Sequence, residues 1–144
     1  MKRIALLFVA IVLCLSLSAC ESPGTTNHAI IDYGHSTMFT HAEIRSAVKV
    51  VFKEFKAFKG CDLLRIRYDE RSTNREYEAA QSNAYSSHKG IARENIMVLL
   101  SDFYVHSPGS STGFNPYSAY ENWSWILIRD SVNDPWVVYS YGYG

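Results

Sequence analysis

Residues 40–60 have the sequence THAEIRSAVKVVFKEFKAFKG. Thr40 and Glu43 have the spacing of a capping box, in which each side chain bonds to the backbone of the other residue at the start of a helix. The apolar residues that follow share one helix face about 140° wide; they are Ile44, Ala47, Val48, Val51, Phe52, Phe55 and Phe58. Gly60 is a natural stop. The stretch therefore predicts an amphipathic helix over roughly residues 41–58.

The opposite side of this helix carries a row of basic residues. Arg45, Lys49, Lys53 and Lys56 all lie away from the apolar face when the chain turns by about 100° per residue. Such a row is the ordinary solvated side of an amphipathic helix. The alternative is that it leans on a membrane surface, where anionic lipids attract Lys and Arg.

Four later segments have the pattern of strands. Residues 63–68 alternate between apolar and polar side chains, which indicates a strand with one exposed face. Residues 95–106 are apolar on both faces, so we expect a central strand with the helix on one side. Residues 122–129 and 136–141 flank a turn and together predict a β-hairpin.

The intervening segments are polar. Within residues 69–94 we expect one short helix, over residues 76–85. Residues 107–120 are rich in Ser, Gly and Pro and predict a long loop, which is a functional candidate because such loops are uncommon in compact domains. The order of elements predicts the α+β class, with one long amphipathic helix packed on a curved antiparallel sheet of about four strands.

The first twenty residues have the features of an export signal. Lys2 and Arg3 precede an apolar run over residues 4–15, and small residues follow it. The alternative is an uncleaved transmembrane helix. A transmembrane helix needs about twenty apolar residues, and this run has only about twelve. The end of the segment, Leu17-Ser18-Ala19-Cys20, resembles the lipobox of bacterial lipoproteins. The resemblance implies cleavage before Cys20 and attachment of a diacylglyceryl group, with acyl chains such as palmitate, to the Cys20 thiol.

These features predict three parts of the chain. Residues 1–19 are a lipoprotein signal peptide, residues 20–38 a lipidated cysteine and flexible tether, and residues 39–144 a single α+β domain. The tether is inferred from Ser, Pro, Gly, Thr and Asn without apolar periodicity. Two acyl chains hold a protein stably on a bilayer. We therefore expect a lipid-anchored protein on the extracytoplasmic face of a bacterial membrane, with the bilayer as a partner through acylated Cys20.

Charge and cysteine content narrow the function further. Loss of Lys2 and Arg3 with the signal leaves twelve basic side chains against fourteen acidic ones, which gives no support to nucleic-acid binding. Of the three cysteines, Cys14 leaves with the signal and Cys20 is acylated. Cys61 then has no partner for an internal disulfide, and we expect it to be a buried small apolar residue.

Several segments resemble a family of small, uncharacterised Firmicute lipoproteins with a domain of unknown function. The resemblance rests on residues 95–103 (NIMVLLSDF), Asn115-Pro116, residues 123–130 (WSWILIRD) and the final Tyr141-Gly142-Tyr143, and spans the chain from about Phe39 to the end. It implies no known activity. That family often carries an acidic residue before its Trp-Gly-Tyr end, where this chain has none. The order of helix and strands is also similar to cystatin-like and nuclear-transport-factor-like cones, which host both enzymes and binding modules.

Asp102 is the candidate for acid–base chemistry. It follows a buried apolar run, and a partly desolvated carboxyl can act as a general acid or base in a small hydrolase or isomerase. His106 is its candidate partner, although residues four apart on a strand lie about 13 Å from each other. Asp102 is equally suited to pair with Arg129, with Arg65 or with a backbone donor near the strand end. The five histidines lack metal-site spacing, so we expect no metal and no cofactor.

Aromatic side chains gather in the last two predicted strands. Trp123, Trp125, Tyr139 and Tyr141 are candidates for a pocket or interaction surface, under the loop at residues 107–120. A small hydrophobic or carbohydrate-like ligand, or an extended peptide, would suit such a surface. Core packing explains the same residues, and is favoured for Trp125. We therefore expect a ligand- or protein-binding module of the cell envelope, with the small hydrolase or isomerase as the alternative.

Overall fold

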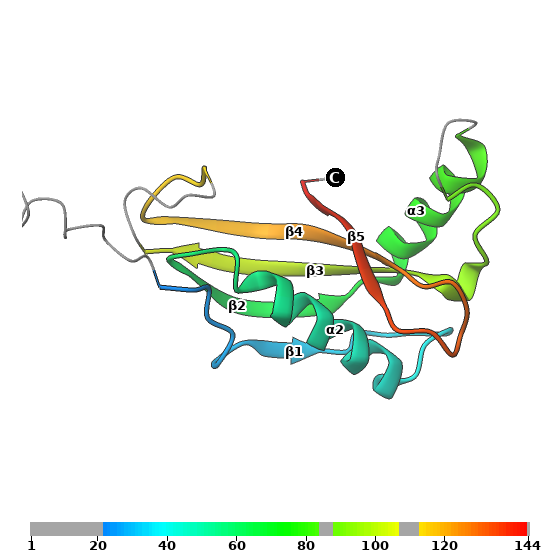
Figure 1. The fold of residues 1–144 in the computed structure, drawn as a ribbon, viewed down its shortest axis with the longest axis horizontal. Helices are drawn as coiled ribbons and strands as arrows, with labels where there is room; N and C mark the ends of the chain where they lie inside the picture. Colours follow the sequence, from blue (N-terminus) through cyan, green and yellow to red (C-terminus); the bar gives the residue numbers. More distant parts are fainter. Residues whose placement is uncertain (1–21, 84–87, 107–112, 144) are drawn as a thin grey trace, which may run out of the picture.

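The computed structural model describes residues 22–83, 88–106 and 113–143 as an α+β fold with a five-stranded mixed sheet. The strands lie in the order β1-β2-β3-β4-β5; β1 pairs with β2 in parallel, and the other neighbours are antiparallel. Helix α2 covers one face of the sheet, and α3 lies beside one end of β3 (Figure 1). The elements are β1 (Ile30–Asp32), α2 (His41–Phe55), β2 (Cys61–Tyr68), α3 (Glu70–Ser82), the single turn η1 (Arg93–Asn95), β3 (Ile96–Val105), β4 (Ser118–Ile128) and β5 (Val137–Gly142).

Helix α2 begins as its sequence predicts. The Thr40 side chain accepts from the Glu43 amide, and the Glu43 carboxylate accepts from the Thr40 amide, so the capping box is complete. The helix ends three residues earlier than predicted, at Phe55. Beyond it, the Phe58 amide donates to the Phe55 carbonyl in a tighter turn, and this turn still delivers the Phe58 ring to the core.

Strand β3 is the central strand, as predicted. Its neighbours are β2 and β4, and alternate side chains from Met97 to Val105 pack under α2. On the opposite face, Ile96 and Val98 are buried at the end where α3 packs. The Thr73 hydroxyl of α3 donates to the Asp69 carbonyl at 2.7 Å and accepts from the Val98 amide at 3.0 Å, which ties α3 to β3.

The prediction of a flexible tether over residues 20–38 is wrong for its described part. Ile30–Asp32 form β1, which pairs in parallel with Arg65–Arg67. Before it, Thr25 forms a bridge with Asp62. The sequence did not indicate this strand, because a three-residue edge strand is held by backbone hydrogen bonds and needs no apolar periodicity. The same missed strand explains why the sheet has five strands and is mixed rather than purely antiparallel.

Two other boundaries differ from their predictions. Helix α3 begins at Glu70 rather than residue 76, because the Asp69 side chain accepts from the Ser72 amide and caps it. Strand β4 begins at Ser118, so it takes up the end of the predicted loop at residues 107–120. The predicted β-hairpin is confirmed as β4 and β5, and Cys61 is buried as expected.

The predicted signal peptide, Cys20 and part of the predicted loop, at residues 107–112, lie outside the described residues. Within residues 22–83, 88–106 and 113–143, no helix has both the length and the apolar character to span a bilayer.

Candidate functional site

The five residues predicted for a pocket or interaction surface do not lie together at one site. They are Asp102, Trp123, Trp125, Tyr139 and Tyr141. Trp123, Trp125 and Tyr141 contact Phe58, on the face of the sheet covered by α2. Asp102 lies opposite Arg65 in the β2–β3 ladder, and its side chain points to the other face. Tyr139 also differs from Tyr141, because its ring contacts His88 beside α3. The predicted pocket is therefore not formed by these residues together.

The space between α2 and the end of the sheet is filled by aromatic rings. Phe58, Phe103 and Phe114 contact one another with ring centroids 5.1–5.7 Å apart. Trp125 is fully buried among them, and its indole Nε1 donates to the Ser101 hydroxyl at 2.8 Å. Trp123 is half-buried in the same cluster. Trp125 is therefore a core residue, the interpretation that the sequence favoured, and Trp123 packs against the same cluster.

Asp102 has two structural partners, an arginine other than the two expected and a backbone amide, which was among the expected partners. Its carboxylate lies 3.5 Å from the Arg67 guanidinium and accepts from the Asn122 amide at 2.9 Å. Neither Arg129 nor Arg65 forms this ion pair. His106 instead lies 2.8 Å from Asp62, so the structure does not bring together the Asp102–His106 pair of the enzyme alternative.

Strand β5 is the most exposed apolar segment of the sheet. It is an edge strand of the sheet formed by the described residues, with β4 as its neighbour. Val137 is 57 % exposed, Tyr139 49 % and Tyr141 53 %, and Tyr143 follows directly after the strand with 63 % exposure. The sequence predicted that Tyr139 and Tyr141 belong to a pocket or interaction surface. Their position on an edge strand required knowledge of the strand order.

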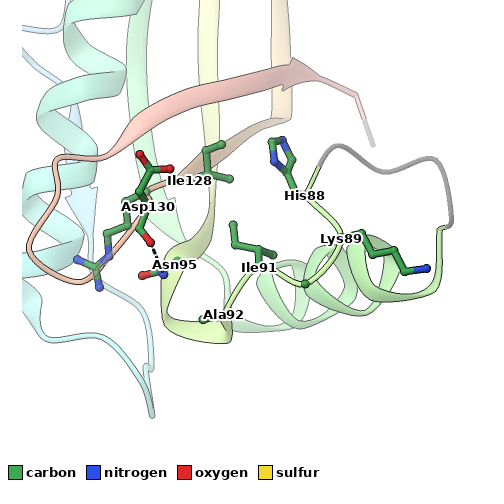
Figure 2. Close-up of a pocket in the computed structure, with 9 residues that line it drawn as sticks. His88, Lys89, Ile91, Ala92, Asn95, Ile128 and Asp130 are labelled. Carbon is green, nitrogen blue, oxygen red and sulfur yellow. Dashed lines mark hydrogen bonds between the residues drawn. The ribbon is translucent and has the colours of Figure 1, made fainter.

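A shallow cavity adjoins β5 on the side of α3. It has a volume of about 390 Å³ and is lined by His88, Lys89, Gly90, Ile91, Ala92, Asn95, Ile128, Arg129 and Asp130. Figure 2 shows the Lys89 side chain extending away from it, while the Asn95 amide donates to the Asp130 carbonyl at 3.1 Å. His88 connects the cavity to β5 through its ring contact with Tyr139. Ile128, opposite Val137 in the ladder, gives the cavity an apolar wall.

The turn between β4 and β5 is held by a buried cation. The Arg129 guanidinium pairs with Glu43 at 3.0 Å, and its carbon lies 4.3 Å from the centre of the Trp136 ring. Burial raises the pKa of Glu43, but hydrogen bonds from Thr40 and Arg129 outweigh this, so the pKa lies below its ordinary value. The Glu43 carboxylate is therefore a structural anion that fixes the start of β5.

No group of three His, Cys, Asp or Glu side chains in the described part of the chain is arranged as a metal site. Comparison with known protein families, curated proteins and solved structures finds no match to this chain.

Proposed function

We propose that the chain is a lipid-anchored module of the cell envelope that binds an extended segment of another envelope protein along strand β5. The observation that carries this proposal is the exposed edge of β5, where Val137, Tyr139 and Tyr141 are each about half exposed. An edge strand presents unpaired backbone N–H and C=O groups that a second strand can join.

The composition of β5 favours such pairing. Natural proteins protect exposed edges with charged residues or proline. Residues 137–142 read VVYSYG and contain neither. At the other edge, β1 has only three residues. The β5 edge is therefore the better platform for an added strand.

The side chains of β5 define what the bound segment should look like. Tyr139 and Tyr141 are two residues apart and would share a face in a regular strand, but the bulge in the β4–β5 ladder separates them. A partner strand would therefore meet Tyr141 on the α2 side and Tyr139 on the α3 side. The cavity beside His88 and Ile128 lies on the Tyr139 side and suits one apolar side chain of the partner. An extended segment with apolar or aromatic residues on both faces fits this surface better than a small ligand, because the aromatic cluster fills the space under α2.

The anchoring part of the proposal rests on the sequence of residues 1–20. The charged start, the apolar run and the lipobox-like Leu17-Ser18-Ala19-Cys20 support an acylated Cys20 and a position on the extracytoplasmic face of a bacterial membrane. We further propose a fold related to the cystatin-like or nuclear-transport-factor-like cones. Helix α2 followed by the consecutive antiparallel strands β2 to β5 supports this relation, whereas the parallel pairing of β1 counts against it.

Selection from a displayed library of random peptides, followed by amide hydrogen exchange, tests the binding edge. Selected peptides should slow the exchange of β5 amides, and the double variant Tyr139→Lys/Tyr141→Lys should weaken them by at least about tenfold, since charges block edge pairing. The matched control is Val132→Lys, at an exposed apolar residue in the preceding turn. Peptides that protect another surface, or bind the double variant equally well, would refute the β5 proposal.

A further inference from the structure

We infer that one end of the domain rests directly on the bilayer, which turns the β5 edge away from the membrane. This inference rests on the proposed acylation of Cys20. The membrane-facing end comprises Ser22, the turn at residues 56–60 and the start of β4 at Tyr117-Ser118. It is matched to an anionic lipid surface.

The chain joins the fold almost immediately after Cys20. The Ser22 carbonyl accepts from the Gly60 amide at 2.9 Å, and the Gly24 amide donates to the Lys56 carbonyl at 3.1 Å. Thr25 continues this contact, because its amide donates to the Cys61 carbonyl at 2.9 Å. One residue separates Cys20 from Ser22 in the sequence, and a residue spans at most about 3.6 Å. A lipid on Cys20 would therefore hold this end at the membrane.

Gly24 explains why this docking is close. A Cβ atom at this position would lie 2.2 Å from the Phe55 carbonyl oxygen and 2.8 Å from that of Phe58. Only a residue without a side chain fits against the end of α2. The segment after Cys20 is thus fitted to the fold. A flexible tether of about 18 residues would instead leave the orientation free over ~20–25 Å.

The residues exposed at this end suit a lipid surface. Lys56 and Lys59 are exposed in the turn that receives Ser22. Val105 pairs with both Cys61 and Ser118, so Tyr117 lies at the same end of the sheet, and this residue is 66 % exposed. Tyrosine rings and lysines are favoured at membrane interfaces, where lysine meets anionic headgroups. Among the described residues next to this turn in the sequence, Asp62 is paired with His106 and Glu54 is exposed.

This orientation would place most of the proposed binding edge away from the membrane. Strand β5 pairs with β4 only from Ile128 back to Ser124, six residues from Ser118. At about 3.3 Å per residue, the backbone at the nearest paired end of β5 is ~20 Å along β4 from Ser118, and the Tyr141 side chain reaches back to the Phe58 ring. The turn that contains Asn133 lies at the opposite end of the sheet (Figure 1). A fixed anchor would thus present the β5 edge to partners in the envelope.

Fluorescence quenching in vesicles tests this orientation. The full chain, expressed in a bacterium, is purified, its acylation is checked by intact mass, and it is reconstituted into phosphatidylcholine–phosphatidylglycerol vesicles with nitroxide headgroups. In a Cys61→Ala background, a fluorophore is attached at Lys59→Cys, Tyr117→Cys or Asn133→Cys. We expect quenching at the first two positions at least about twofold stronger than at Asn133→Cys, because the ends of the sheet are ~30 Å apart. A Gly-Ser insert of about ten residues after Glu21, with an r.m.s. span of ~16–19 Å, should remove this difference.

The possible outcomes separate this inference from the anchoring proposal. Equal quenching at the three positions in an acylated protein overturns the orientation and leaves anchoring intact. Stronger quenching at Lys49→Cys than at Lys59→Cys places α2 flat on the bilayer and also overturns it. A protein without acylation overturns both. The charge contribution is checked with Lys56→Glu/Lys59→Glu, which should weaken quenching at Tyr117→Cys when phosphatidylglycerol is present, whereas Lys49→Glu should not.

Discussion

The guanidinium group of Arg129 lies 3.0 Å from the carboxylate of Glu43, which joins the end of β4 to the first turn of α2. The same guanidinium donates to the Glu94 carbonyl at 3.0 Å and to the Val132 carbonyl at 3.3 Å. Its side chain is buried, with 4 % exposure. One cation therefore fixes the turn from which β5 begins, and with it the position of the proposed binding edge.

Glu43→Gln should lower the free energy of unfolding. Glutamine keeps the shape of Glu43 and can still complete the capping box, so the change isolates the loss of charge beside Arg129. Breaking a buried ion pair costs ~3–5 kcal/mol, but Glu43 is 33 % exposed, and we expect ~1–3 kcal/mol. Urea denaturation measures this, with Glu54→Gln on the exposed side of α2 as the control. Equal midpoints for the Glu43 variant and the wild type would mean that the pair does not stabilise the fold.

Asp62 should make the protein less stable in acid. A hydrogen bond from the Thr25 hydroxyl, helped by the contact with His106, holds the pKa of Asp62 below its ordinary value despite partial burial. The unfolded chain, with a pKa of about 3.9, then binds more protons than the native state. The stabilisation is therefore complete above about pH 5 and is lost as the pH falls through 4 to the lower folded pKa. Urea midpoints between about pH 3 and 7 should fall less steeply with acid for Asp62→Asn than for the wild type; parallel curves would exclude this role.

Gly24→Val should release the segment that follows Cys20. The added side chain cannot fit beside the Phe55 carbonyl, so the Ser22–Gly60 and Thr25–Leu63 backbone hydrogen bonds should open. Faster hydrogen exchange of the Gly60 and Leu63 amides, with β3 amides unchanged, is the expected signature. Pro23→Ala, at the exposed neighbouring residue, serves as the control. Unchanged protection at Gly60 would show that this docking does not depend on Gly24.

Ser101→Ala should destabilise the aromatic core without unfolding it. The Trp125 indole N–H would lose its acceptor in a buried site, which costs ~1–3 kcal/mol. Thermal unfolding followed by near-ultraviolet circular dichroism reports both the stability and the packing of the tryptophans. The control is Ser124→Ala on the neighbouring strand. A variant as stable as the wild type would indicate that the indole finds another acceptor.

Local signals in the sequence predicted most of the fold. The capping box of Thr40 and Glu43 located the start of α2, and the apolar run after Asn95 identified the central strand, because both signals are set by neighbouring residues. Strand β1 could not be predicted this way. Its backbone partners, Arg65–Arg67, lie more than thirty residues away, and its own residues have no helix or strand periodicity.

The candidate site was only partly predictable, for a related reason. Tyr139 and Tyr141 were selected by residue type, but whether they line a pocket or an edge depends on the strand order, in which β5 is terminal. The ion-pair partner of Asp102 is Arg67, which lies two residues along β2 from Arg65, the residue opposite Asp102, and the sequence does not reveal this register. The pairing of strands therefore determines the environment of these tyrosines and the partner of Asp102, neither of which follows from residue type alone.

Intact mass and detergent partitioning of the chain expressed in a bacterium, compared with Cys20→Ala, test the central claim of a lipid-anchored envelope module most directly. We predict that the wild type loses residues 1–19, gains the mass of a lipid and enters the membrane fraction, and that the variant shows none of these changes. A wild type that is uncleaved, or cleaved without added lipid and recovered in the soluble fraction, would contradict the claim.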